Sequence, residues 1–381
     1  MPLTRRDFTR LGAAGLATQL IPGFPRLLHA QGAPSSGAQS SESEKKVGYA
    51  IIGLGRIADH FMRGIQESGN SRVTGLVSGH PEKAAQIAEK YGVPKESIYN
   101  YQNMDGMKDN PSIQAVYVAL PNGMHAEYTI RSAKAGKHVL CEKPMASTVA
   151  EAESMIAACN ETKVKLMIAY RCHYEASNQH AIQLIRDGAI GKIEQIQSTY
   201  GFICNPSDWR MDKALAGGGP MMDVGIYSLN ATRYLTGEEP AEISAYSYTD
   251  KMDTRFKGGV EANIGWTCKF PSGAITSCNT SYAAQMPGYY RVYGSKGWLL
   301  GSPIFDYSNL HLTGSIPSEQ NPHQEIDELN PEKDPHQFTN EADHFSDCVL
   351  HNKTPKTTGA EGLQDMKLIR QIYHSAGIAM A

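Results

Sequence analysis

The stretch VGYAIIGLGRIA, residues 47–58, constrains the fold of this chain more than any other part of it. Its apolar first half has the length of a buried strand, and a G-x-G-x-x-A turn and a helical pattern follow directly. In such a unit Gly53 permits the tight turn, Gly55 lets the main chain approach a pyrophosphate, and Ala58 allows the helix to pack closely on the strand. The helix N-terminus then offers N–H groups to the phosphates. The flanking strand and helix favour a dinucleotide site over an ordinary glycine turn.

Strand and helix patterns alternate beyond this unit, which predicts a parallel, doubly wound sheet and an α/β fold over residues 47–169. The first helix follows the glycine turn, and further helices are expected at 81–91, 125–135 and 148–161. The accompanying strands are expected at 72–77, 113–119, 137–141 and 164–170.

The rest of the chain, residues 170–381, has a different pattern. After a helix at 175–187, segments of period 2 dominate, and they predict a second domain with a meandering antiparallel sheet. Two helices, near 340–350 and 362–375, close this domain. The period-2 segments lie at 192–200, 242–248, 261–270, 274–283, 290–293 and 298–300.

The end of the second expected strand indicates which nucleotide is bound. An NAD site usually has a carboxylate there, which accepts hydrogen bonds from the adenosine ribose. Here the strand ends in Ser78, and Lys83 follows one helical turn later, with Arg56 available from the glycine turn. A hydroxyl and positive charges suit a 2′-phosphate, so the composition favours NADP over NAD. The alternative is that Lys83 is only a solvated surface residue.

Two further loops follow strands of the predicted sheet, where open α/β sheets bind ligands. One loop is LPNGMH, residues 120–125, and the other is Glu142-Lys143-Pro144. A lysine beside a nicotinamide is able to hydrogen-bond a substrate oxygen. Taken alone, such a lysine is more often a surface charge.

Asp223 and Tyr227 form a second candidate group. They follow the three glycines of residues 217–219, and a spacing of four places them on one face of the expected helix. A carboxylate one turn from a phenol is able to orient it or the substrate. The alternative is a buried tyrosine whose hydroxyl is satisfied by protein groups.

The N-terminal residues 1–46 differ in composition from the rest of the chain. Arg5-Arg6, a short apolar run and small residues before Ala30 are typical of a twin-arginine signal peptide over residues 1–30, with export of the folded protein to the periplasm. The apolar run is too short to span a bilayer. Residues 31–46 are small and polar, which predicts a flexible arm.

Charge and cysteine content exclude several classes of partner. A net charge of −3 gives no reason to expect nucleic acid or, after signal removal, a membrane as partner. Seven widely spaced cysteines contain no C-x-x-C pair, so neither a metal site nor a disulfide framework is expected.

Several motifs together resemble one family. The glycine turn, LPNGMHAE, GKHVLCEKPMA and GGGPMMDVGIY are similar to the oxidoreductase family that includes glucose–fructose oxidoreductase and inositol dehydrogenase, and the resemblance runs from about Val47 to Gly377. LVSGHPEKA, MIAYRCHYE and EGLQDMKLIRQIY are most similar to its glucose–fructose branch, and so is Tyr227, where many relatives have histidine. The resemblance implies a Rossmann domain followed by an α/β domain with a large, mostly antiparallel open sheet. This second domain is expected to bind the substrate and to form a homo-oligomer, dimer or tetramer, through its sheet.

The resemblance also implies roles for individual residues. Lys143 is the family's catalytic lysine, and Tyr227 and Asp223 join it as catalytic residues. The substrate contacts are Lys143, Arg171, Asp223, Tyr227 and Tyr307. The cofactor contacts are Gly53, Leu54, Gly55, Arg56, Ile57, Ala58, Ser78, Lys83, Tyr101, Leu120, Pro121, Asn122, His125, Glu142, Lys143, Arg171, Trp209 and Arg210.

The implied reaction is hydride transfer from C1 of an aldose to a tightly bound NADP, which yields a lactone. Tyr227 takes the O1 proton, Lys143 lowers the pKa of the phenol or shares the proton, and Asp223 orients the sugar. A second sugar such as fructose then takes the hydride back. The alternatives are an aldose dehydrogenase or reductase with exchangeable cofactor, which the short arm allows, an NAD-dependent glycosidase, and a sugar sensor without enzymatic activity.

Overall fold

The computed structural model describes residues 46–379, so the expected signal peptide and all but Lys46 of the expected arm lie outside the described part. Six parallel strands form the first sheet in the order β3-β2-β1-β4-β5-β6. The order reverses between β1 and β4, and ligands of open α/β sheets bind at such a switch point. The strands are β1 (Val47–Ile52), β2 (Ser71–Val77), β3 (Ile98–Tyr99), β4 (Ala115–Val118), β5 (His138–Glu142) and β6 (Leu166–Ala169).

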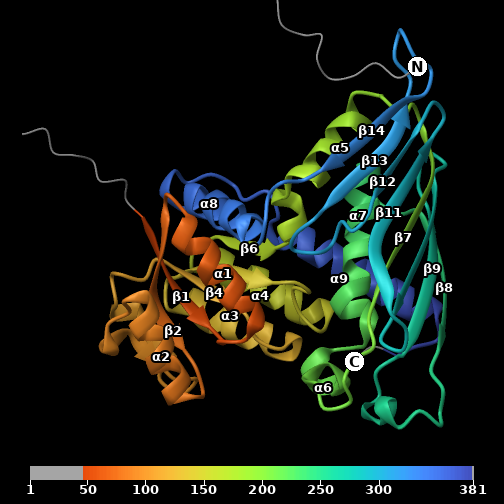
Figure 1. Ribbon diagram of the computed structural model, residues 1–381. Coiled ribbons are helices and arrows are strands. Elements are labelled where there is room, and N and C mark those ends of the chain that lie inside the picture. Colours follow the sequence, from red (N-terminus) through yellow and green to blue (C-terminus); the bar gives the residue numbers. More distant parts are fainter. Residues whose placement is uncertain (1–45, 380–381) are drawn as a thin grey trace, which may run out of the picture. The chain divides into compact units, whose positions relative to one another are not determined.

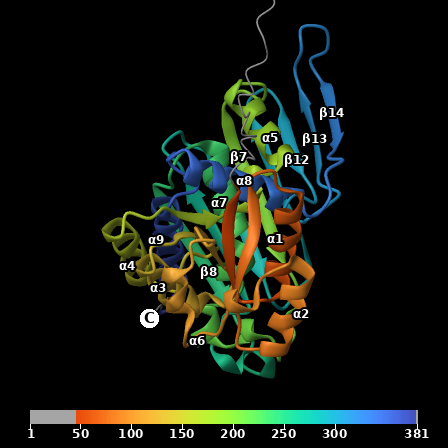
Figure 2. The same ribbon diagram turned by 90° about the vertical axis from the view of Figure 1, so that its left-hand side faces the viewer.

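Helices cover both faces of this sheet (Figure 2). One face packs against α3 (His125–Lys134) and α4 (Val149–Glu161), and the other against α1 (Arg56–Glu67) and α2 (Pro81–Tyr91). The sequence signals act locally as expected. Thr148 and Glu151 form a capping box at the start of α4, and Gly92 ends α2 in the left-handed conformation.

The second sheet has eight strands in the order β14-β13-β12-β11-β7-β10-β9-β8. Neighbouring strands are antiparallel except β7 and β10, which are parallel. The predicted open, mostly antiparallel sheet is therefore confirmed. Its strands are β7 (Ile193–Gly201), β8 (Glu242–Tyr248), β9 (Asn263–Lys269), β10 (Ile275–Ser281), β11 (Met286–Gly294), β12 (Trp298–Gly301), β13 (His311–Ile316) and β14 (Gln324–Leu329).

Three helices lie on one face of the second sheet, on the side of the parallel sheet: α5 (Ala176–Arg186), α7 (Ile226–Thr236) and α9 (Gly359–Ser375) (Figure 1). A short helix, α6 (Lys213–Ala216), precedes the three glycines. The remaining helix, α8 (His336–Leu350), packs on α1 and the first sheet through Phe338 and Phe345. This helix therefore completes the first layer, although it lies in the range predicted for the second domain.

Two details differ from the sequence expectations. The strands β13 and β14 were not expected, because β14 is mostly exposed and shows little alternation of apolar residues. The helix expected near Pro220 begins as a π-helical turn, η6 (Met221–Gly225), before α7 continues as an α-helix. Residues four apart stay close to one face in a π-helical turn as well, and Lys143 contacts both Asp223 and Tyr227.

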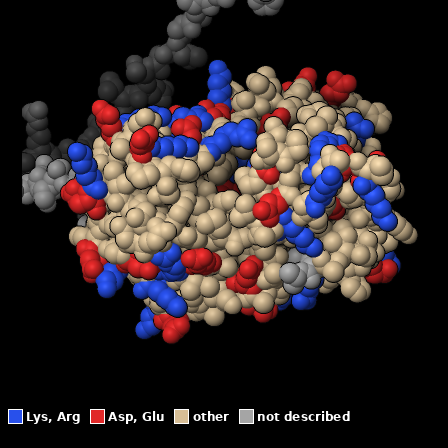
Figure 3. All heavy atoms as spheres, turned by 90° about the horizontal axis from the view of Figure 1, so that it is seen from below, with Lys and Arg blue, Asp and Glu red and all other residues tan. Residues whose placement is uncertain are grey.

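Basic and acidic side chains are interspersed on the face shown in Figure 3. All seven cysteines are buried and free. Within residues 46–379, no helix is long and apolar enough to cross a membrane, and no group of three or more His, Cys, Asp or Glu side chains is placed to hold a metal.

Candidate active site

The glycine turn at the switch point has the form that a dinucleotide requires. Gly53 has a φ of +88°, and a Cβ there would lie 2.6 Å from the Ala119 carbonyl oxygen, so only glycine fits. Gly55 is exposed, and a Cβ there would meet nothing within 4 Å. Among residues 46–379, no side chain caps the N-terminus of α1, where Arg56 is exposed. An open cradle with free N–H groups therefore lies beside the strand end, and it fits a pyrophosphate.

The end of β2 lies next to this cradle. Ser78 is buried, and its hydroxyl accepts from the main-chain N–H of His80 at 3.0 Å. The edge of the Tyr101 ring lies beside Gly79, at 3.1 Å from where a Cβ would be. Lys83 is exposed on the first turn of α2. The structure thus brings the predicted hydroxyl, ring and cation to one strand end.

Buried polar side chains connect the loop after β4 to the neighbouring loops. The two ring nitrogens of His125 each lie 2.8 Å from a carbonyl oxygen, of Leu120 and of Pro144. Burial lowers the pKa of this imidazole. The side chain of Asn122 donates to the Ala216 carbonyl at 2.8 Å. His125 and Asn122 therefore hold the loops around the site, and the cofactor contacts that the resemblance implies for them stay predictions.

Glu142 is also engaged by the protein. Its carboxylate accepts from the hydroxyl of Tyr117 and, at 3.1 Å, from the main-chain N–H of Lys143. Burial raises the pKa of Glu142, and the Lys143 ammonium opposes this rise. Glu142 therefore fixes the loop that carries the lysine.

The side chain of Lys143 meets Asp223 in η6. Its Nζ donates to the Asp223 carbonyl oxygen at 2.6 Å and lies 3.4 Å from Oδ1. The other carboxylate oxygen, Oδ2, accepts from Arg210 Nε at 2.7 Å and from the Tyr282 hydroxyl at 2.9 Å. Burial lowers the pKa of Lys143, and Asp223 opposes this change. Burial raises the pKa of Asp223, but Arg210 and Lys143 outweigh it and hold the carboxyl ionised.

The phenol of Tyr227 faces two cations. Its hydroxyl accepts from Arg171 Nε at 3.2 Å, and Lys143 Nζ lies 4.6 Å from the ring centroid. Burial raises the pKa of Tyr227 well above its usual value, and Arg171 is the main opposing influence. The cation that donates to the hydroxyl is therefore Arg171, and the expected action of Lys143 on the phenol stays a prediction.

Hydrogen bonds to three further residues hold the Arg171 guanidinium in place. Its Nη1 donates to Gln337 at 2.6 Å and to the Asp306 carbonyl at 3.0 Å, and its Nη2 donates to the Phe305 carbonyl. The guanidinium lies 4.4 Å from the centroid of the Tyr307 ring. Tyr307 and Tyr227 therefore share the Arg171 guanidinium, and the expected position of Tyr307 near the substrate stays a prediction.

Trp209 and Arg210 lie in a short 3₁₀ helix, η5 (Trp209–Met211), where the Arg210 guanidinium is 4.7 Å from a Trp209 ring centroid. The structure thus gathers Lys143, Asp223, Tyr227 and Arg210 into one connected group. Tyr282 and Gln337 also belong to the site and were not predicted from the sequence. No sequence signal points to either, because each meets its partner only through the fold.

Chemically, the group combines a phenol held by a guanidinium with an ammonium held by a carboxylate. The ammonium is able to hydrogen-bond a substrate oxygen, and the phenol is able to accept or donate a proton. Both lie at the carboxyl ends of the parallel strands, on the side of the glycine turn. This arrangement suits hydride transfer coupled to proton transfer.

Comparisons with known proteins agree with this geometry. Residues 47–170 match the model of the oxidoreductase family with an NAD-binding Rossmann fold, and residues 178–300 match that family's C-terminal domain. The solved aldose–aldose oxidoreductase from Caulobacter crescentus is 44% identical, with a TM-score of 0.83, and the match covers 87% of this chain and 98% of that chain.

A curated relative, the D-xylose 1-dehydrogenase [NADP(+)] of Haloarcula marismortui, is 28% identical over 89% of this chain and 93% of its own length. The solved levoglucosan dehydrogenase in complex with NADH and levoglucosan shares the fold, with a TM-score of 0.76 at 22% identity over 87% of this chain and 98% of that chain. The resemblance seen in the sequence motifs is confirmed: this chain belongs to the Gfo/Idh/MocA family of oxidoreductases.

Proposed function

We propose that the protein is an exported, NADP-dependent sugar oxidoreductase that oxidises an aldose at C1 to a lactone and passes the hydride to a second sugar. The observation that carries the proposal is the pairing of Tyr227 with Arg171, 3.2 Å from hydroxyl to Nε, beside the ammonium of Lys143. Such a site is built to exchange a proton with a sugar hydroxyl.

The choice of NADP rests on the end of β2. Ser78 places a hydroxyl where NAD sites usually have a carboxylate, and Lys83 and Arg56 are exposed cations near the same ligand-binding edge. The NADP(+) dependence that the xylose dehydrogenase relative carries in its name supports the same choice. Bound in the cradle at Gly55, NADP supplies the nicotinamide carbon that accepts and returns the hydride.

Side chains of the protein accept and return the proton. The hydroxyl at C1 gives its proton to the Tyr227 oxygen while the C1 hydrogen leaves as hydride, so that the C1–O bond becomes a carbonyl. Arg171 and Lys143 stabilise the phenolate that receives this proton, because both are cations within 5 Å of the phenol. Asp223 holds the Lys143 ammonium in place, and we propose that Asp223 also orients the sugar.

The second half of the reaction reverses these movements. Tyr227 returns its proton to the carbonyl oxygen of a second sugar as the carbonyl carbon takes up hydride, which yields an alditol. The name of the Caulobacter crescentus relative, an aldose–aldose oxidoreductase, supports a two-sugar reaction and favours an aldose as acceptor, beside a ketose such as fructose. The xylose dehydrogenase relative supports the competing proposal, oxidation of one sugar with cofactor that exchanges.

Export and assembly are further parts of the proposal. The twin arginines and the small residues of 1–30 support transport of the folded protein to the periplasm. The helices that contact the eight-stranded sheet lie on one of its faces. Side chains on the other face, such as Tyr246 at 82% exposure, support a homo-oligomer formed through that sheet.

A labelled substrate tests the proposal. The mature protein, purified without added nucleotide, is incubated with an aldose deuterated at C1 and with an unlabelled second sugar, and the products are followed by NMR. We expect an unlabelled lactone and an alditol that carries deuterium at the former carbonyl carbon.

The matched variant Tyr227→Phe should form neither product but should still release NADP on denaturation. Label that appears in the alditol only when free nucleotide is added would overturn the two-sugar cycle. Oxidation by Tyr227→Phe at the wild-type rate would overturn the role of the phenol.

A further inference from the structure

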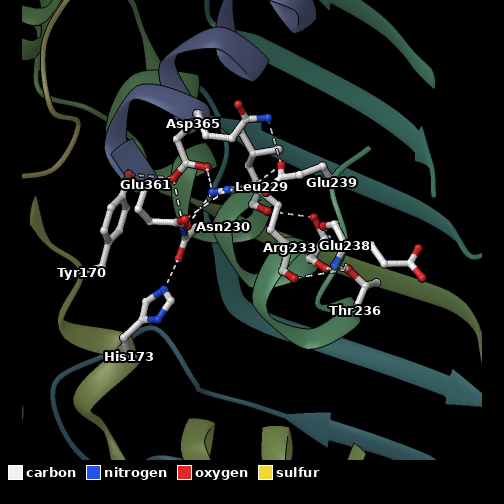
Figure 4. A network of polar contacts seen from close by, with 12 residues as sticks. Tyr170, His173, Leu229, Asn230, Arg233, Thr236, Glu238, Glu239, Glu361 and Asp365 are labelled. Atoms are coloured by element: carbon white, nitrogen blue, oxygen red, sulfur yellow. Dashed lines mark hydrogen bonds and ion pairs between the residues drawn. The ribbon is translucent and has the colours of Figure 1, made fainter. Parts of the chain in front are cut away.

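A network of polar contacts lies buried behind the candidate active site, between α7, α9 and the chain just after β6 (Figure 4). Its centre is Asp365 of α9, which is fully buried. One carboxylate oxygen accepts from Arg233 Nη1 at 2.6 Å, and the other accepts from the Tyr170 hydroxyl at 2.7 Å and from Asn230 Nδ2 at 3.0 Å. His173 lies 2.7 Å from the remaining polar atom of Asn230, its Oδ1.

Two of these partners are direct neighbours of the residues that form the active site. Tyr170 immediately precedes Arg171, and Asn230 lies one helical turn after Tyr227 on α7. Asp365 therefore joins the segment that carries the guanidinium to the helix that carries the phenol. The Arg171–Tyr227 hydrogen bond spans the same two segments.

The space between the network and the active site is nearly filled. A cavity of about 10 Å³, at the lower limit for one water molecule, separates Tyr170 and Asn230 from Lys143 and Tyr227. Close-packed interiors transmit small displacements, because there is little free volume to absorb them. A shift of Tyr170 or Asn230 therefore moves the residues that line the other side of this cavity.

Arg233 has other partners that do not touch the site. Its Nη2 donates to Glu239 at 2.6 Å, and its Nη1 also donates to Glu361 at 2.6 Å. The side chain of Glu239 is half exposed, whereas that of Asp365 is fully buried. The arginine thus keeps counter-charges when one partner is changed, and Glu239 offers a control within the same network.

We propose that Asp365 is a positioning residue: through Tyr170 and Asn230 it sets the separation of the Arg171 guanidinium from the Tyr227 hydroxyl. The proposal rests on the proposed function, because it gives this separation a catalytic consequence. It also assigns a purpose to the EGLQDMKLIRQIY segment, which contains Asp365 but lies outside the active site.

The first test compares three variants with the wild type. Tyr170→Phe removes one hydroxyl at nearly constant volume, Asp365→Asn removes the charge, and Glu239→Gln perturbs Arg233 without touching Tyr170 or Asn230. The measurement is the rate at which a saturating aldose reduces the bound cofactor, together with the KM for the sugar. We expect about a tenfold fall in rate for Tyr170→Phe, the effect of one charge-assisted hydrogen bond, with unchanged KM.

The pH profile of kcat/KM distinguishes a positioning role of Asp365 from a role in stability alone. If Arg171 moves away from Tyr227, the phenol loses the cation that opposes the rise of its pKa. The acid limb of kcat/KM should then move to higher pH in Tyr170→Phe and Asp365→Asn and stay in place in Glu239→Gln. The titratable and charged groups that face Tyr227 are Arg171, Cys172, Glu142, Lys143, Tyr200 and Tyr307.

A crystal structure of Tyr170→Phe tests the proposal without any activity. We expect the distance from Arg171 Nε to the Tyr227 hydroxyl to exceed 3.5 Å, beyond hydrogen-bond range. A retained distance of 3.2 Å, or variants that lose thermal stability while keeping the wild-type rate and pH profile, would overturn the proposal. Absence of sugar oxidation by the wild type would overturn the proposed function alone, because the crystallographic distance still decides the role of Asp365.

Discussion

Replacing Asp223 by asparagine removes the negative charge that holds two cations in the active site. The Lys143 Nζ lies 3.4 Å from Oδ1, and the side chains of both residues are at most 13% exposed. The hydrogen bond from Nζ to the main-chain carbonyl of residue 223, 2.6 Å long, does not depend on the side chain. The substitution is therefore expected to change the charge balance at the lysine more than its position.

The size of this effect follows from the distance. Two unit charges 3.4 Å apart interact by about 5 kcal/mol at an effective dielectric constant of about 20. That energy corresponds to a fall of about 3 to 4 units in the pKa of Lys143, which burial already lowers. Lys143 in the variant should then lose its proton at a lower pH than in the wild type, because Asp223 opposes the fall in the lysine pKa that burial causes.

The assay is the pH dependence of cofactor reduction by an aldose, followed in a stopped-flow instrument at the absorbance of reduced nicotinamide. We expect the basic limb of the profile to move down by about 3 pH units in Asp223→Asn, with partial recovery of the rate at low pH. Asp208→Asn is the matched control, because Asp208 pairs with Arg210 at 3.2 Å but does not contact Lys143. A basic limb at the wild-type pH in Asp223→Asn would refute the reasoning.

Three further predictions concern the cofactor and stability. Ser78→Asp should weaken NADP binding about a thousandfold and favour NAD, since a carboxylate about 4 Å from a phosphate costs about 4 kcal/mol; fluorescence titration with both nucleotides checks this. Gly55→Ala should keep the wild-type melting temperature but bind nucleotide more weakly, whereas Gly53→Ala should melt lower, because its Cβ would lie 2.6 Å from the Ala119 carbonyl oxygen. Glu341, fully buried with both carboxylate oxygens unpartnered within the described residues, has a pKa raised well above its usual value by burial. The folded state therefore binds more protons than the unfolded state, and the stability of the wild type falls as pH rises. Relative to the wild type, Glu341→Gln should gain free energy of unfolding as the pH increases above about pH 4, and denaturant titration measures this difference.

Local signals predicted the first domain well. The glycine turn, the capping box at Thr148 and the proline at Pro81 each act within a few residues, so their helices begin where the sequence indicates. The second sheet was predicted to be mostly antiparallel, but the order of its strands was not predicted. β7 enters between β10 and β11 through pairings that join residues some 80 to 100 positions apart, and no local pattern specifies them.

The sequence indicated which residues form the candidate site better than it indicated their contacts. Lys143, Asp223 and Tyr227 meet as expected, but the cation at the phenol hydroxyl is Arg171. The π-helical turn and the partners Tyr282 and Asp365 could not be predicted, because these contacts depend on the packing of distant segments. Asp365, for example, meets Tyr170 across 195 positions of the chain.

The central claim, a sugar-to-sugar hydride transfer on retained NADP, is tested most directly by one absorbance trace. The mature protein is purified without nucleotide, an aldose is added, and a second sugar follows after the trace is steady. The account predicts that the reduced-nicotinamide absorbance rises to one equivalent per site on the first addition and falls to baseline on the second. A protein that shows no rise until free NADP is supplied would contradict retention, and a rise that no second sugar reverses would contradict the two-sugar cycle.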